Sequence, residues 1–141
     1  LAFDSELLIQ REVVIPITMN LLVKAGSSLS DVRKVISYPH ALAQVRSFLR
    51  ENLPDAELEA ANSTAHAANL LSESAELNVA AVGTSLAAEK YGLDILAEGI
   101  EDHQGNKTRF VLIARDGIPA PTGHDKTTVV VFQQSDRPGS C

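Results

Sequence analysis

The 141-residue sequence is poor in cysteine and in aromatic residues, and it lacks tryptophan altogether. Its one cysteine, Cys141, is the last residue, so the chain has neither an internal disulfide nor a site with several cysteine ligands for a metal. Aromatic residues make up only 4% of the sequence, so a core has to be built mainly from Ala, Val, Leu and Ile. The longest apolar runs are far too short to span a bilayer.

Positive charge is also in deficit, because 12 basic residues face 18 acidic ones, for a net charge of −6. This balance argues against nonspecific binding to nucleic acid or to an anionic membrane, although a local cationic pocket remains compatible with it. The opening residues lack the basic segment of a secretory signal, so we expect a cytoplasmic protein. Because the chain starts at Leu1 and residues 136–141 resemble the interior of a domain, we also expect a part of a longer protein.

Strand-like and helix-like segments alternate along the chain. Residues 9–24 predict one long strand or two strands bent at Pro16. Apolar residues recur with helical spacing after Pro39 and predict one helix that stops at 52–55, with Ser37 as its N-cap. Other strands are expected at 32–36, 57–61, 79–83, 93–100, 107–114 and 127–132, and other helices after 62–64 and 84–85. The order predicts an α/β sheet with helices on its faces.

Hydroxyl-bearing residues follow three of the expected strands, at Ser37, at Ser63 with Thr64, and at Thr84 with Ser85. In α/β sheets, ligands bind at the carboxyl ends of the strands, where helix N-termini offer free amides to anions. The residues fit a small carboxylate or phosphate site, and they equally fit ordinary helix caps.

A second group of polar residues, 106–110, enters a strand whose apolar continuation, 111–113, is expected to be core. Arg109 offers a guanidinium that pairs with a carboxylate through two hydrogen bonds, and Thr108 offers a hydroxyl. A strand edge with a solvated arginine is the other interpretation. The four histidines lack metal-ligand spacing, so no zinc site is expected.

Four motifs follow one another along the chain: Ser37-Tyr38-Pro39-His40-Ala41-Leu42-Ala43-Gln44, Ser63-Thr64-Ala65-x-Ala67-Ala68, the block from Ala80 to Leu96, and Ile100-x-Asp102-x-x-x-Asn106-x-Thr108-Arg109-Phe110. In order and in spacing, these motifs resemble those of the prephenate dehydratase family. Tyr38 and His40 depart from the family pattern, which usually has His and Gln there. Residues 126–132 and 136–139 resemble the start of an ACT regulatory domain.

The resemblance implies a fold and a domain organisation. Residues 1–115 would be the second lobe of the catalytic region with its connecting strands. The lobe is similar to that of a type II periplasmic binding protein, with βα units and helices on both faces of the sheet. Residues 116–125 would be a linker, and residues 126–141 the first strand of an ACT domain of the α+β class. The first lobe is missing from this sequence.

The resemblance also implies an activity, the conversion of prephenate to phenylpyruvate with loss of carbon dioxide and water, on the route to phenylalanine. No metal and no cofactor is required. The family pattern implies that Thr108 assists departure of the hydroxide and that Arg109 holds a carboxylate or shapes the site. Substrate would be bound at Ser37, Ser63, Thr64 and Asn106, with Phe110 packing beneath. Phenylalanine would act as a regulator, and the ACT domain would pair protomers into a dimer or tetramer.

Two alternatives remain open. The chain could be a carboxylate-binding lobe without turnover, of the periplasmic-binding-protein class, or a structural piece whose caps are only caps. Residues 106–110 favour the dehydratase, since a simple binding lobe has no reason to carry them. Because the cleft needs both lobes, we expect little or no activity from these 141 residues alone.

Overall fold

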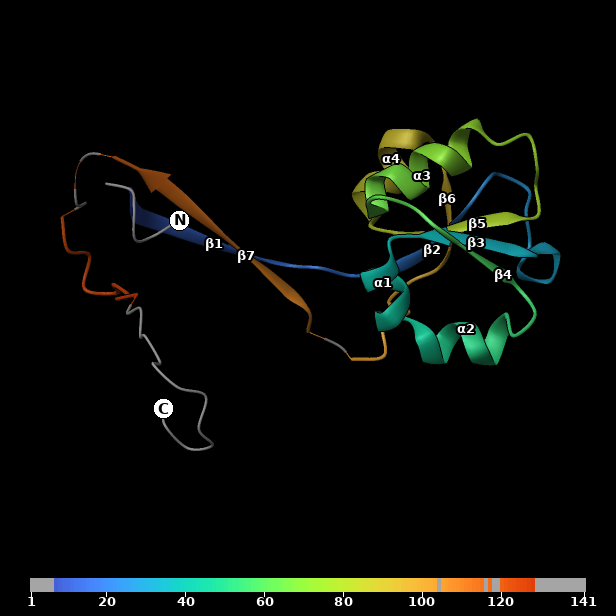
Figure 1. Ribbon diagram of the computed structural model, residues 1–141, viewed down its shortest axis with the longest axis horizontal. Coiled ribbons are helices and arrows are strands. Elements are labelled where there is room, and N and C mark those ends of the chain that lie inside the picture. Colours follow the sequence, from blue (N-terminus) through green and yellow to red (C-terminus); the bar gives the residue numbers. More distant parts are fainter. Residues whose placement is uncertain (1–6, 104, 116, 118–119, 129–141) are drawn as a thin grey trace, which may run out of the picture. The chain divides into compact units, whose positions relative to one another are not determined.

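The structure, a computed structural model, describes residues 7–103, 105–115, 117 and 120–128. The chain divides into two compact units, Val13–Phe110 and the segments on either side of it. The larger unit is built on a five-stranded sheet with the order β4-β3-β5-β2-β6 (Figure 1). Its strands are β2 (Asn20–Val23), β3 (Lys34–Ser37), β4 (Glu57–Ala60), β5 (Val79–Gly83) and β6 (Asp94–Ala97).

Three neighbouring strands of this sheet are parallel. In the register, Lys34 of β3 lies opposite Glu57 of β4 and opposite Val79 of β5. Strand β2 runs antiparallel to β5, with Asn20 opposite Gly83. The carboxyl ends of β3, β4 and β5 and the amino end of β2 therefore share one edge, called the carboxyl edge below.

Helices cover both faces of the sheet (Figure 1). Because side chains alternate between the faces of a strand, Leu21 and Val35 pack with the helices α1 (Pro39–Gln44) and α2 (Arg46–Asn52). Their neighbours Leu22 and Ile36 pack with α3 (Thr64–Glu73) and α4 (Ser85–Tyr91) on the other face. The predicted α/β lobe with helices on both faces is confirmed.

The segment after Ser37 differs from its prediction in two ways. It forms two helices, α1 and α2, that break at Val45, and the N-cap of α1 is Tyr38, which makes no side-chain cap bond. Ser37 is the last residue of β3. The apolar stripe is continuous across the break, so the sequence spacing alone could not reveal it.

Other predicted boundaries agree more closely with the structure. Residues 9–24 form two strands, β1 (Leu8–Pro16) and β2, and the predicted caps Ser63 and Thr84 do cap α3 and α4. The strand expected at 93–100 is shorter, and a 3₁₀ turn, η1 (Leu29–Asp31), precedes β3. Of the strand expected at 127–132, residues 127 and 128 are described and are not in a strand, and the rest lies outside the described residues.

Strand β7 (Lys107–Ala114) matches its predicted bounds and pairs with β1 in a two-stranded sheet. Its apolar residues are exposed, with fractions of 37% for Val111, 54% for Leu112 and 49% for Ile113. The prediction that these three residues are core is wrong for this structure. Within the described residues of their own unit no helix packs on them, whereas helices bury the central strands of the five-stranded sheet.

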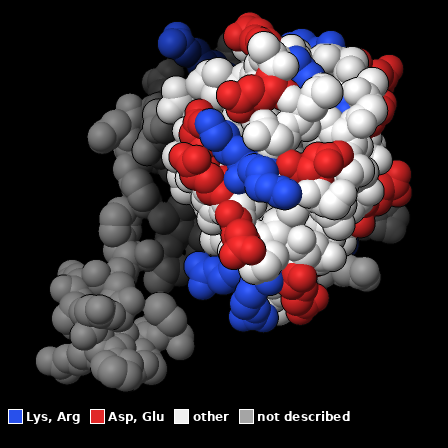
Figure 2. Space-filling view, turned by 90° about the vertical axis from the view of Figure 1, so that its right-hand side faces the viewer, with Lys and Arg blue, Asp and Glu red and all other residues white. Residues whose placement is uncertain are grey.

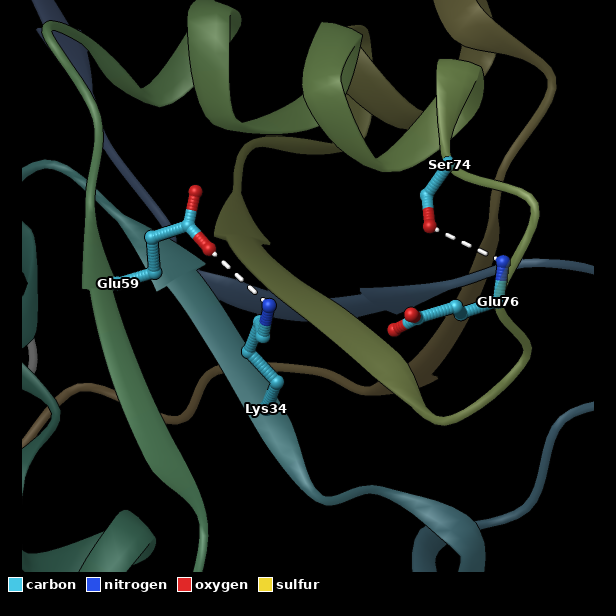
Figure 3. A network of polar contacts seen from close by, with 4 residues as sticks. All are labelled: Lys34, Glu59, Ser74 and Glu76. Carbon is cyan, nitrogen blue, oxygen red and sulfur yellow. Dashed lines mark hydrogen bonds and ion pairs between the residues drawn. The ribbon is translucent and has the colours of Figure 1, made fainter.

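Charges of both signs are mixed over the face in Figure 2, where Lys and Arg lie among Asp and Glu. One pair joins neighbouring strands, since Lys34 Nζ lies 3.3 Å from Glu59 Oε2. Figure 3 shows this pair together with the turn in which the Glu76 amide donates to Ser74 Oγ. The hydrogen bond to Glu59, with its charge, raises the pKa of Lys34 above its usual value.

None of the helices in the described part of the chain is long and apolar enough to cross a membrane.

Candidate active site

Ser37 ends β3 at the carboxyl edge and is fully buried. Its carbonyl accepts a 2.9 Å hydrogen bond from the Ala61 amide, which ties the ends of β3 and β4 together. Its hydroxyl has no hydrogen-bond partner among the described residues. A buried polar group without a partner costs about 1–3 kcal/mol of stability. This hydroxyl is therefore available to donate a hydrogen bond to a ligand or to accept one from it.

The N-terminus of α3 lies at the same edge, directly after β4. Ser63 Oγ accepts a 3.0 Å bond from the His66 amide, and the Ser63 carbonyl accepts from Ala67. Thr64, half-buried, is the first residue of the helix. His66 is held in place in turn, because its Nδ1 accepts from the Asn62 amide at 3.3 Å. Capping accounts for the Ser63 oxygen, and the helix dipole still favours an anion beside it.

Thr84 follows β5 at this edge and caps α4, accepting from the Ala87 amide at 3.3 Å. The strand order and register therefore place Ser37, Ser63 with Thr64, and Thr84 at one edge of the sheet.

Asn20 is a buried polar residue at this edge that the sequence motifs did not single out. It is 3% exposed, starts β2 opposite Gly83, and accepts a 3.2 Å bond from the Gly99 amide at its Oδ1. A signal was available, because an amide side chain interrupts the apolar run from Met19 to Val23. Its amide nitrogen is a second donor at the carboxyl edge.

Residues 99–101 and Asn106 lie beside residues 17–20, where β2 begins. The Ile100 amide donates to the Met19 carbonyl at 2.9 Å, and the Met19 amide donates to Glu101 Oε2 at 3.0 Å. The Ile17 amide donates to the Asn106 carbonyl at 2.8 Å. These bonds fix Asn106 beside the chain that enters β2.

Thr108, Arg109 and Phe110 follow on β7, and all three are exposed, Phe110 at 53%. Within the described part of the chain, no hydrogen bond joins the Thr108 hydroxyl to Ser37 or Ser63. The larger unit contains every residue that the motifs singled out as a site residue. Ser37, Ser63 and Thr64 lie at the carboxyl edge, and the Asn106 carbonyl is bonded to the chain that enters β2.

The chemistry of this set is that of neutral donors. Hydroxyls, a carboxamide and helix amides suit a carboxylate, which they bind without a permanent counter-charge. No group of three or more metal-ligating side chains occurs among the described residues. A groove of about 370 Å³ lies elsewhere, between α1, α2 and β4, and its lining does not include Ser37 or Ser63.

Comparison with known proteins finds a match to the family model described as "Prephenate dehydratase" over residues 1–118. A prephenate dehydratase of Mycobacteroides abscessus is 46% identical over 132 residues, which are 93% of this chain and 42% of that protein. The chain thus spans about two fifths of the length of this relative.

Solved structures agree with the sequence comparison. A prephenate dehydratase of Arthrobacter aurescens, in complex with L-Phe, matches with a TM-score of 0.77 and 40% identity, over 84% of this chain and 40% of that one. A protein named GqqA, described as a novel type of quorum quenching acylase, matches with a TM-score of 0.71 and 34% identity, over 82% of this chain and 41% of that one. With a family match over residues 1–118 and an α/β lobe of the same fold, the chain belongs to the prephenate dehydratase family.

Proposed function

We propose that the protein containing this chain converts prephenate to phenylpyruvate, and that the chain supplies one wall of the active site. The observation that carries the proposal is the set of neutral donors at the carboxyl edge, headed by the buried hydroxyl of Ser37 that lacks a partner. Prephenate carries two carboxylates and a ring hydroxyl. Ser37, Ser63, Thr64 and Asn106 bind one carboxylate through hydroxyls, an amide and the α3 N-terminus.

The reaction requires the ring hydroxyl to leave while the C–CO₂ bond breaks, and the electrons of that bond form the aromatic ring. Thr108 donates a hydrogen bond to the departing oxygen. Since a threonine hydroxyl is a very weak acid, it stabilises the charge that develops there and does not transfer the proton fully. Arg109 holds the second carboxylate through its guanidinium, and Phe110 packs beneath the ring.

The chain spans 42% of the M. abscessus relative, so turnover requires segments beyond these residues. The proposed organisation is a catalytic region over residues 1–115, a linker over 116–125, and the start of an ACT domain over 126–141. The A. aurescens structure contains L-Phe, which supports phenylalanine as a regulator here as well. Pairing through ACT domains would give a dimer or tetramer.

A second candidate is amide hydrolysis, because GqqA shares the fold of this chain at 34% identity and is described as an acylase. An acylase needs an activated nucleophile or an activated water. At the carboxyl edge the hydroxyls of Ser63 and Thr84 accept helix amides, and among the described residues no hydrogen bond joins either hydroxyl to a histidine ring or a carboxylate. We therefore rank the dehydratase first.

The test compares two substrates with one preparation of the full-length protein. We expect phenylpyruvate to form from prephenate, measured by its absorbance, and no amine to be released from an N-acyl homoserine lactone. The 141-residue chain alone, tested in parallel, should give little or no phenylpyruvate. Release of the amine without formation of phenylpyruvate would overturn the proposal in favour of the acylase, and binding of prephenate without turnover of either substrate would favour a binding lobe.

A further inference from the structure

Asp102 belongs to the fourth sequence motif but has no part in the proposed chemistry. Its backbone and its side chain contact both sides of the break between α1 and α2. The Asp102 amide donates to the carbonyl of Gln44, the last residue of α1, at 2.7 Å. Its Oδ1 accepts from the amide of Ser47, the second residue of α2, at 3.0 Å.

These two bonds replace bonds that a continuous helix would make. In one helix from 39 to 52, the Ser47 amide would donate to residue 43, and the Gln44 carbonyl would accept from residue 48. Asp102, distant in sequence, takes both the freed donor and the freed acceptor. A carboxylate also suits this position, because the amino end of a helix carries partial positive charge.

Asp102 is also the start of the short connection that leads to β7. The two residues before it are held to Met19, by the Ile100 amide and by the Glu101 carboxylate. Asn106, four residues later, is held through its carbonyl by the Ile17 amide. Gly105, with a φ of +91°, turns the chain between these two anchors.

We propose that Asp102 is a positioning residue, one that fixes the segment carrying Asn106, Thr108 and Arg109 to the helix pair that follows Ser37. It touches no substrate and acts by setting where Thr108 stands relative to the carboxyl edge. The inference rests on the proposed function only for its effect on turnover, because the hydrogen bonds are present without substrate.

The test uses the full-length protein with Asp102→Ala, Asp102→Asn and the control Asp55→Ala. Asp55 lies in the loop before β4, at the opposite edge of the sheet, and its carboxylate has no hydrogen bond or ion pair within the described residues. Hydrogen exchange of the Ser47 and Ile17 amides reports the anchors directly and requires no activity. Prephenate kinetics report the consequence for the reaction.

In Asp102→Ala we expect faster exchange at Ser47 and at Ile17, and a fall in kcat of about 10- to 100-fold with a smaller change in KM, since misplacement by about 1 Å can cost ~10²-fold. Asp102→Asn keeps an oxygen that accepts the Ser47 amide, so exchange and kcat should stay within about threefold of the wild type. The control Asp55→Ala should change neither the exchange of these amides nor kcat.

Three results would overturn the inference. The first is unchanged exchange in Asp102→Ala. The second is a kcat for that variant no lower than that of the control. The third is an Asn variant that loses protection at Ser47 or loses more than about tenfold in kcat, and this result can be read even if the Ala variant does not fold. If wild-type protein has no turnover, the proposed function fails, and hydrogen exchange alone decides whether Asp102 anchors the segment.

Discussion

Strand β5 and residues 110–114 of strand β7 are both apolar, and they have opposite environments. All five residues of β5 are buried, because the strand lies inside the sheet with helices on both faces. In β7, seven of the eight residues are exposed, and within the described part of the chain β1 is its only neighbour in the sheet. The comparison teaches that an apolar run predicts a strand well, but predicts burial only where the fold provides a layer on each face.

The largest expected effect comes from the same substitution, leucine to alanine, in a strand buried inside the five-stranded sheet and in the exposed strand β7. Leu22→Ala removes a fully buried side chain from β2 and should lower the free energy of unfolding by about 2–5 kcal/mol. Leu112→Ala removes one that is 54% exposed in β7, and should cost less than about 1 kcal/mol. Urea unfolding of the 141-residue chain measures both. Equal losses in the free energy of unfolding would contradict the difference in burial between the two strands.

Ser37→Ala is expected to raise stability. The substitution removes a buried hydroxyl that has no partner, and the relief should add about 1 kcal/mol to the free energy of unfolding. In the full-length protein the same variant should raise KM for prephenate, because the hydroxyl binds the substrate. A variant that is less stable and has an unchanged KM would show that the hydroxyl serves the fold instead of the ligand.

Ser63→Ala should cost about 1 kcal/mol, since it removes the cap that accepts the His66 amide at the start of α3. Ser63→Gly should cost only a few tenths of a kcal/mol, because glycine is itself a tolerated cap. Thermal unfolding of both variants beside the wild type gives the two differences. A glycine variant that loses as much as the alanine variant would argue that the Ser63 side chain has a role besides capping.

The smallest effect concerns pH. The pKa of Lys34 is raised by Glu59, so the pair stabilises the fold below the unfolded value of 10.5 and loses this contribution as pH rises through the folded pKa. Glu59→Gln should therefore remove a small part of the loss of stability in alkaline solution. Glu57→Gln is the matched control, because Glu57 influences Lys34 only weakly through charge. Equal behaviour of the two variants in alkaline urea titrations would contradict the assignment.

The sequence predicted those features that depend on neighbours along the chain. The strand bounds of β7 and the caps Ser63 and Thr84 follow from local preferences, and the structure has all of them. The helix break at Val45 could not be predicted from neighbours along the chain. The groups that bond to its two sides belong to Asp102, 55 residues after Ser47 in the sequence.

The candidate site shows the same difference between features set by neighbours along the chain and features set by the sheet order. Hydroxyls after strands predicted the carboxyl edge, since parallel strands end together. Asn20 was missed because β2 is antiparallel and reaches this edge with its amino end, which only the sheet order shows. Exposure of residues 111–113 was missed because strand propensity does not say whether a layer covers the strand.

The measurement that tests the central proposal most directly is prephenate turnover by the full-length protein with Thr108→Val and Thr108→Ser. Valine keeps the shape of threonine and removes the hydroxyl, so kcat should fall by about 10²- to 10³-fold with a smaller change in KM. Serine keeps the hydroxyl and should retain most of the activity. A valine variant with wild-type kcat would contradict the role of Thr108 in the departure of the ring hydroxyl.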